Sequence, residues 1–159
     1  MSTPPEGPTE AIARRVSALR QRKGLNRQQL GEAMAANGVE WNRFTVSSLE
    51  NGKRQNVTVV ELLTLAKVLD VAPVHLLVPL EDEHPYQVTP KLTMPATRVR
   101  AWIRGQKPLP GTDLQIFYTE VPLDEVRSVR TVQFGGRHGS AELNAWASEE
   151  QAEGGDSGE

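Results

Sequence analysis

The sequence predicts a mainly helical fold class: a five-helix domain, a proline-rich linker and a small, mostly helical C-terminal region. Three observations favour it. In the first half, apolar residues recur at the three- and four-residue spacing of a helix face. Cap residues and glycines mark where these segments begin and end. Prolines then recur in a pattern typical of an extended segment, at Pro79, Pro85, Pro90 and Pro95.

Five predicted helices account for residues 9–80. The first carries Ile12, Val16 and Leu19 on one face. Thr9 can cap its start, and Gly24 can end it in a left-handed conformation.

The remaining helices of this domain follow from their cap residues. Asn26, Asn42 and Thr58 are good N-caps, so we expect three further helices to begin after them. A glycine follows the second and the third of the five segments, where it can stop each helix. Pro73 can open a fifth, short helix that ends near Leu77.

These patterns divide the chain into five parts. We expect a disordered arm at residues 1–8, the five-helix domain at 9–80, an extended linker at 81–96, a small C-terminal region at 97–147 and a disordered acidic tail at 148–159. The C-terminal region contains the aromatic residues Trp102, Phe117, Tyr118 and Trp146. They either supply a dimerisation or partner surface or form a small second core, and we favour a contribution to assembly.

Composition excludes several classes of function. The chain has no cysteine, so disulfide scaffolds, thiolate zinc sites, iron–sulfur clusters and cysteine nucleophiles are ruled out. Its three histidines are widely spaced, and no metalloprotease, phosphate-loop or serine-hydrolase motif is present. We therefore expect no enzymatic activity, no catalytic residue, no metal and no cofactor. No apolar stretch approaches the ~20 residues of a membrane span, and the start lacks a signal peptide, so we expect a cytoplasmic protein.

Charge is unevenly distributed along the chain. Residues 9–80 contain ten Lys and Arg against six Asp and Glu, a net charge of +4. Residues 81–159 contain eight against thirteen, a net charge of −5. A basic half favours a polyanionic partner for that half alone, although an ordinary solvated surface explains the charge equally well. The motifs must decide between these interpretations.

Four motifs occur in order between Ile12 and Leu77. They are Arg20, GLNRQQL at residues 24–30, VSSLENGKR at 46–54 and VTVVELLTLAKVLDVAPVHLL at 57–77. In these motifs the sequence resembles the phage-repressor-like (Cro or XRE type) helix-turn-helix family. The resemblance implies a lambda-repressor-like helix-turn-helix domain over 9–80 that binds double-stranded DNA, and a transcriptional regulator that we expect to be a repressor. Because one module of this size makes too few base contacts for high specificity, we also expect a homodimer. The resemblance also implies that Arg20 pairs with Glu50.

The resemblance implies a recognition helix near residues 43–51, whose exposed side chains reach base edges in the major groove. The expected base-contacting residues are Arg43, Phe44, Thr45, Ser47 and Ser48. The expected phosphate-contacting residues are Arg27, Gln28, Asn51, Lys53 and Arg54, with a plain solvated role equally expected for Gln28. Arg43 can form two hydrogen bonds to guanine, and Phe44 either presses on a thymine methyl or packs against the second helix.

The sequence leaves two questions open: the structure between the second and third helices, and the function of the C-terminal half. Leu30 and Val46 lie sixteen positions apart, more than a compact helix-turn-helix allows. Either the second helix is longer or the turn is a loop carrying Trp41, a residue type that more often fills a core than stacks on bases. The alternative function is a protein-interaction module, such as an antitoxin-like binder or an adaptor, that uses the acidic C-terminal half.

Overall fold

Helices dominate the computed structural model, which describes residues 4–122. The chain divides into two units, residues 1–109 and 110–159. The first unit contains the helices α1 (Pro8–Arg22), α2 (Arg27–Ala36), α3 (Arg43–Glu50), α4 (Val59–Val68), α5 (Pro73–Leu77) and α6 (Ala96–Ile103). Two strands, β1 (Pro85–Thr89) and β2 (Leu92–Pro95), form an antiparallel hairpin between α5 and α6. The mainly helical prediction is confirmed over the described residues.

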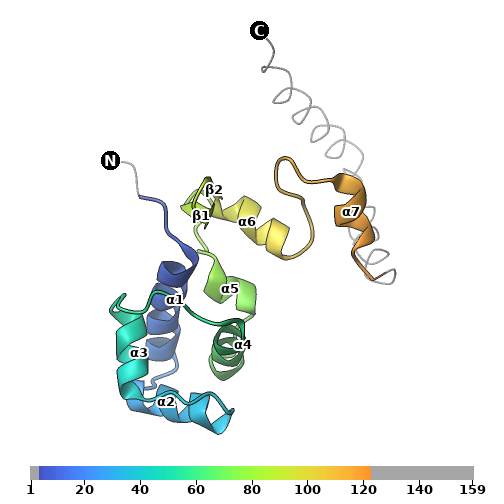
Figure 1. Ribbon diagram of the computed structural model, residues 1–159. Coiled ribbons are helices and arrows are strands. Elements are labelled where there is room, and N and C mark those ends of the chain that lie inside the picture. The colour runs from blue at the N-terminus through green and yellow to red at the C-terminus, as the bar shows by residue number, and fades with distance from the viewer. Residues whose placement is uncertain (1–3, 123–159) are drawn as a thin grey trace. The chain divides into compact units, whose positions relative to one another are not determined.

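The first five helices enclose one apolar core. Figure 1 shows α1 in the middle, with α3 on one side of it, α4 and α5 on the other, and α2 crossing below. Each helix contributes side chains that are almost fully buried, among them Val16, Leu30, Val46, Leu65 and Leu76. This core fixes α2 and α3 against each other and leaves the outer side of α3 uncovered.

The predicted caps set most helix boundaries. The side chains of Asn26, Asn42 and Thr58 accept hydrogen bonds from the first-turn amides of α2, α3 and α4. Gly24 and Gly52 have positive φ angles, as helix-ending glycines do. α1 differs, because Gly7 takes the cap position and Pro8 the first helical position, where a missing N–H costs nothing.

The connection between α2 and α3 is a loop. α2 ends at Ala36. Trp41, in the loop, is buried in the core and is therefore not available to stack on bases. α2 also approaches this loop closely, because a Cβ on Gly31 would lie 2.8 Å from the Cα of Asn42. The absence of a side chain at Gly31 therefore permits the close packing of α2 against the start of α3.

The linker predicted at residues 81–96 is wrong, because this segment folds into the hairpin. Tyr86 and Met94 face each other across the strands and are buried with Val99 of α6 in a second core. Pro85 and Pro95 pair at the open end of the hairpin, where few ladder hydrogen bonds are lost. The prolines concealed a two-residue alternation that is typical of a strand.

The domain boundary moves accordingly. The first unit extends to Leu109, so the boundaries predicted at 80 and 97 do not separate domains. α6 is joined to the helical core through buried Arg100, which donates hydrogen bonds to the carbonyl of Pro79 and to the Asp82 carboxylate. The Tyr86 hydroxyl adds a 2.9 Å bond to the carbonyl of Leu77.

Part of the predicted disordered arm is also ordered. Glu6 forms a parallel bridge with Tyr86, in which its amide donates to the carbonyl of Pro85 at 3.0 Å and its carbonyl accepts from Gln87 at 3.0 Å. Its carboxylate accepts from Arg14 at 3.0 Å. Glu6 is therefore paired beside the hairpin and Gly7 caps α1, so neither belongs to a free arm, while residues 1–3 lie outside the described range.

The second unit is described only up to residue 122. It contains α7 (Leu114–Thr119), capped by Asp113, whose side chain accepts from the amide of Ile116 at 3.1 Å. Within α7, the Phe117 and Tyr118 rings meet edge to face at 5.2 Å. Trp146, the end of the region predicted at 97–147 and the tail predicted at 148–159 lie outside the described residues.

Candidate nucleic-acid interface

α3 is held to the core by one side and exposes the other. Val46 and Leu49 are fully buried, while Arg43, Phe44 and Asn51 are exposed. Asn42 stops the loop and starts the helix, because its side chain accepts from the amides of Phe44 and Thr45 at 2.9 and 3.1 Å. The first turn of α3 therefore lies at the surface, and its orientation is fixed by the buried side of the helix and by the Asn42 cap.

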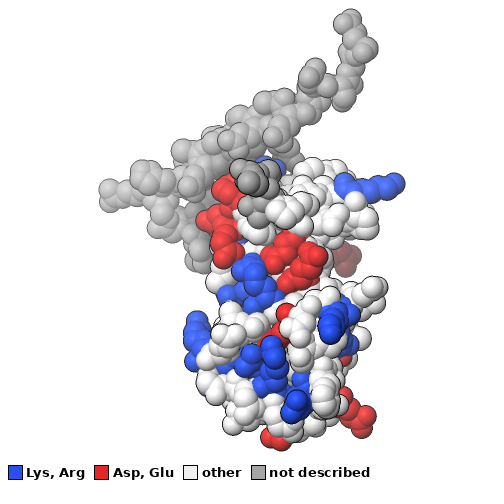
Figure 2. Space-filling model, turned by 90° about the vertical axis from the view of Figure 1, so that its left-hand side faces the viewer, with Lys and Arg blue, Asp and Glu red and all other residues white. Residues whose placement is uncertain are grey.

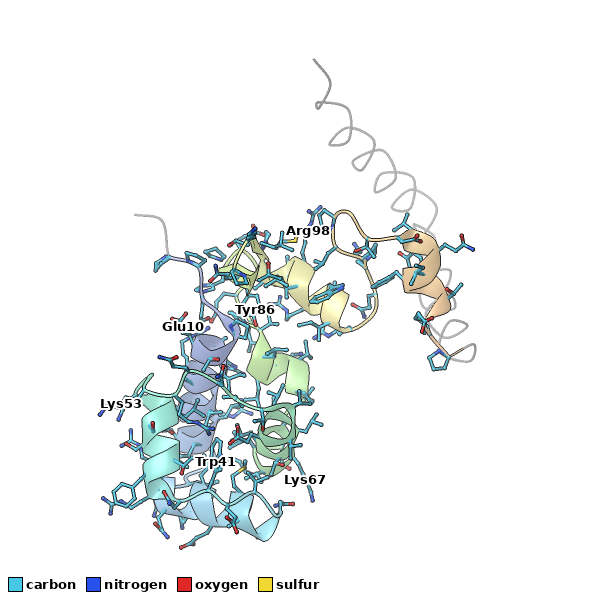
Figure 3. All side chains as sticks on the ribbon, in the orientation of Figure 1. Glu10, Trp41, Lys53, Lys67, Tyr86 and Arg98 are labelled. Carbon is cyan, nitrogen blue, oxygen red and sulfur yellow. The ribbon has the colours of Figure 1, made fainter. Side chains whose placement is uncertain are left out.

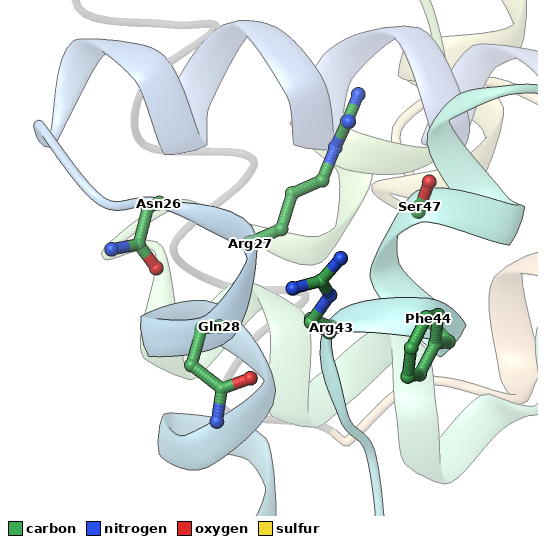
Figure 4. A pocket seen from close by; sticks show the side chains of 6 residues that line it. All are labelled: Asn26, Arg27, Gln28, Arg43, Phe44 and Ser47. Carbon is green, nitrogen blue, oxygen red and sulfur yellow. The ribbon is translucent and has the colours of Figure 1, made fainter.

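The first turns of α2 and α3 enclose a shallow surface hollow of about 490 Å³, called here the α2–α3 hollow (Figure 4). It is lined by Asn26, Arg27, Gln28, Arg43, Phe44 and Ser47. Five of these six residues were predicted to contact DNA. The sixth, Asn26, was predicted only as a helix cap, and its cap position is the signal that places it at this edge.

Arg43 and Phe44 form a stacked pair at the edge of the α2–α3 hollow. The guanidinium carbon of Arg43 lies 4.9 Å from the centre of the Phe44 ring, within cation–π distance. The Phe44 side chain is 70% exposed, so the alternative in which it packs against α2 is wrong.

A buried carboxylate joins α1, α2 and α3. Glu50, whose side chain is only 2% exposed, accepts from Arg20 at 2.6 and 3.1 Å and from Nε of Arg27 at 2.7 Å. The pair of Arg20 and Glu50 implied by the resemblance is thus present. Burial raises the pKa of the Glu50 carboxyl, but the hydrogen bonds and charges of the two arginines outweigh it and hold the pKa below its ordinary value. We call these three residues the Glu50 cluster.

A second carboxylate lies behind the end of α3. Glu61 accepts from the indole N–H of Trp41 at 2.8 Å, from Arg54 at 3.0 Å and from the Thr58 amide at 2.8 Å. The Arg54 guanidinium also stacks over the Trp41 ring at 5.1 Å. Burial raises the pKa of Glu61, and these donors outweigh it, so that the pKa is lowered. We call Trp41, Arg54 and Glu61 the Glu61 cluster.

The remaining predicted residues divide by exposure. Thr45 and Ser48 are half-buried and do not line the α2–α3 hollow. Asn51 is exposed, and its side chain donates to the Ser47 hydroxyl at 3.1 Å. Lys53 is exposed beside the end of α3, away from the core (Figure 3). Asn51 and Lys53 are therefore the exposed residues of this group, and Ser47, half-buried like Thr45 and Ser48, differs from those two in lining the α2–α3 hollow.

Two groups were missed from the sequence. Gly31 gave a weak signal, a glycine inside a helical pattern, but its close contact with the loop could not be located. Glu61 was counted only as an acidic residue, although Glu three positions after a Thr is the spacing of a capping box. Gln28 donates to Glu32 at 2.7 Å on the same helix, which favours a solvated role for it as much as a DNA contact.

Charge gathers on the side that carries α3. In Figure 2, Lys and Arg side chains are spread over the lower part of this side, where α2 and α3 lie in Figure 1. Most of the visible Asp and Glu side chains lie in a band above them. The α2–α3 hollow itself is lined by two cations, Arg27 and Arg43, and by no carboxylate among its six residues.

Within residues 4–122 there is no group of three or more acidic or histidine side chains that could hold a metal ion. In the same range, none of the helices is both long and apolar enough to cross a bilayer. Comparison with known proteins adds no family assignment: no family model, no curated protein and no solved structure matches the chain.

Proposed function

We propose that this protein is a sequence-specific double-stranded DNA-binding transcriptional regulator of the phage-repressor-like type, a repressor in its simplest form, that reads the major groove with α3. One observation carries the proposal. A short helix, fixed to the core by Val46 and Leu49, exposes Arg43 and Phe44 beside the amino-terminal turn of α2, and half-buried Ser47 lines the same hollow. An α-helix fits the major groove, and arginine, serine and an apolar ring match the donors, acceptors and methyl groups found there.

Phosphate contacts flank this helix in the proposal. A guanidinium has five N–H donors, and the bond from Arg27 to Glu50 uses the one on Nε. Because the Arg27 side chain is 45% exposed, its other donors are left for a phosphate at the start of α2, where helix amides also attract anions. Lys53 supplies a second cation after α3. Arg54 is already engaged with Glu61, so we assign it a smaller part.

The proposed active form is a homodimer. One module of this size contacts too few bases for high specificity, whereas two copies about 34 Å apart would read a two-fold symmetric site. Light scattering of the full chain, free and with duplex, gives the stoichiometry directly.

Selection of duplexes from a random pool by the full chain tests the function. We expect enrichment of a two-fold symmetric site and an affinity that falls steeply with salt concentration. Arg43→Ala should weaken binding to that site by about 1–3 kcal/mol and relax the preference at one base pair of each half. Arg98→Ala is the matched control, because Arg98 is an exposed arginine on α6, far from α3 (Figure 3).

The competing function, a protein-interaction module, predicts the opposite pattern. Duplex binding would be weak and indifferent to sequence, and Arg43→Ala would behave like Arg98→Ala. That result would reject the regulator and favour the adaptor or antitoxin-like alternative.

A further inference from the structure

Arg43 and Phe44 are in contact with each other at the surface, so they are not two independent side chains. Phe44 is a large apolar ring that is 70% exposed on a helix whose other exposed residues are polar. A single exposed apolar residue is ordinary on a protein surface. Here, however, the ring also carries the guanidinium of its neighbour at 4.9 Å and lines the α2–α3 hollow. Two chemically different side chains are thus presented as one unit.

The ring restricts where the arginine can go. A free arginine on a surface loses much rotamer freedom when it forms two hydrogen bonds to one base. Stacking on Phe44 removes part of that freedom before DNA is bound, so less is lost on binding. Phe44 stays 70% exposed while it is stacked in this way.

The spacing of the pair matches neighbouring base pairs. Successive bases on one strand are about 3.4 Å apart along the helix axis. Groups 4.9 Å apart can reach two adjacent base pairs but are too close to skip one. In the major groove, a guanidinium is complementary to O6 and N7 of guanine, and an apolar ring is complementary to the 5-methyl group of thymine.

We propose that Arg43 and Phe44 together read a thymine and a guanine at neighbouring base pairs, with Phe44 touching the thymine methyl and holding Arg43 against the guanine. This inference rests on the proposed function and narrows it to one two-base-pair step in each half-site. It makes Phe44 a specificity-determining residue that acts both through its own contact and by positioning Arg43.

The test uses the full chain and the duplex that it enriches from a random pool. In that duplex, each thymine is replaced in turn by uracil, which removes only the methyl group and keeps the base pair. Each guanine is replaced in turn by 7-deazaguanine, which removes only the N7 acceptor. Affinities are measured for the unmodified protein and for Phe44→Ala, Phe44→Leu and Arg43→Ala, with circular dichroism confirming that each variant is folded.

We expect one thymine in each half-site whose replacement by uracil weakens binding about fourfold, the value of one buried methyl group. The guanine whose deaza form weakens binding only when Arg43 is present should be its direct neighbour. Cytosine at the thymine position should bind weakly, and 5-methylcytosine should recover part of the loss.

The variants separate the two roles of the ring. Phe44→Ala should abolish the uracil effect and also reduce the 7-deazaguanine effect. Phe44→Leu should keep the uracil effect, because leucine still covers the methyl, but reduce the guanine discrimination, because leucine offers no ring face to the guanidinium.

Three results would overturn the inference while leaving the regulator intact: an enriched site with no thymine beside the Arg43-dependent guanine, no loss with uracil, or a uracil effect that persists in Phe44→Ala. If no duplex is enriched at all, the proposed function fails, and the inference fails with it.

Discussion

The Glu50 cluster and the Glu61 cluster are built alike but serve α3 differently. Each is a carboxylate that receives an arginine expected from the sequence to contact phosphate, Arg27 in the first and Arg54 in the second. The Arg54 side chain is 25% exposed and also stacked on Trp41, whereas Arg27 is 45% exposed and bonded through Nε alone. The first cluster therefore leaves a cation for a ligand, and the second uses its cation to fasten the chain after α3 to α4.

Two arginines that lie beside α3 are thus held differently by the protein. The quantity that differs is exposure, since the Arg27 side chain is 45% exposed and the Arg54 side chain is 25% exposed. An ion pair at the surface contributes little to the free energy of unfolding. Removing one partner of an ion pair that includes a buried carboxylate lowers the free energy of unfolding much more. The clusters can thus be tested separately, through stability and through binding.

The largest expected effect comes from removing the buried carboxylate. Glu50→Ala leaves Arg20 buried without its partner and should lower the free energy of unfolding by about 3–5 kcal/mol. Glu61→Ala should cost less, about 1–3 kcal/mol, because the indole N–H and Arg54 lose a hydrogen-bond acceptor nearer the surface. Urea unfolding followed by circular dichroism gives both values. Equal losses would mean that the clusters do not differ in burial as described.

The next largest effect comes from a substitution that disturbs the Glu50 cluster and leaves the Glu61 cluster intact. Gly31→Ala places a methyl group 2.8 Å from the backbone of Asn42, so α2 must move away from the start of α3. We expect a loss of about 1–3 kcal/mol, even though alanine favours a helix by ~1 kcal/mol over glycine. Arg27 on α2 should also lose its geometry with Glu50, while Arg54 and Glu61 should be unaffected. A stabilised variant in urea unfolding would contradict this contact.

Acid should weaken both clusters. The pKa values of Glu50 and Glu61 are lowered in the folded protein, so the unfolded chain binds more protons as the pH falls through about 4.3. The stability from each cluster is therefore full near neutral pH and is lost as the pH falls through the lowered values.

Glutamine variants show how much of this acid sensitivity each carboxylate carries. In Glu50→Gln and Glu61→Gln, the free energy of unfolding should be lower at pH 7 and should change less between pH 7 and pH 4 than in the unmodified protein. The flattening should be larger for Glu50, which has two arginine partners. An unchanged pH profile in both variants would place the acid sensitivity elsewhere.

The helical half of the fold was predictable because its signals are local. A cap side chain, a glycine that adopts positive φ and an apolar face each act within one helix, as Asn42, Gly52 and Leu49 do. The hairpin was not predictable in this way. Its pairing of Tyr86 with Met94 is a contact between strands, and its prolines outweighed a short alternating pattern.

In the candidate site, too, the local features were predictable and the tertiary contacts were not. The exposed face of α3 follows from helical spacing once Val46 and Leu49 are placed inside. The engagement of Arg54 by Glu61 was not visible, because Glu61 lies on α4 and meets Arg54 only through the tertiary packing of that helix. Burial separates the Glu50 and Glu61 clusters, and burial is a property of the whole domain.

The smallest effect decides whether this distinction matters for binding. Lys53 and Arg54 are adjacent in the sequence, and both were expected to contact phosphate, but only Arg54 is paired with a carboxylate among the residues described. Lys53→Ala should reduce the slope of log affinity against log salt concentration by about one, as the loss of one phosphate contact does. Arg54→Ala should reduce that slope by much less than one and should mainly lower the midpoint of urea unfolding. If Arg54→Ala reduces the slope as much as Lys53→Ala, pairing with Glu61 does not keep the Arg54 cation from a phosphate, and the distinction between the two clusters has no consequence for binding.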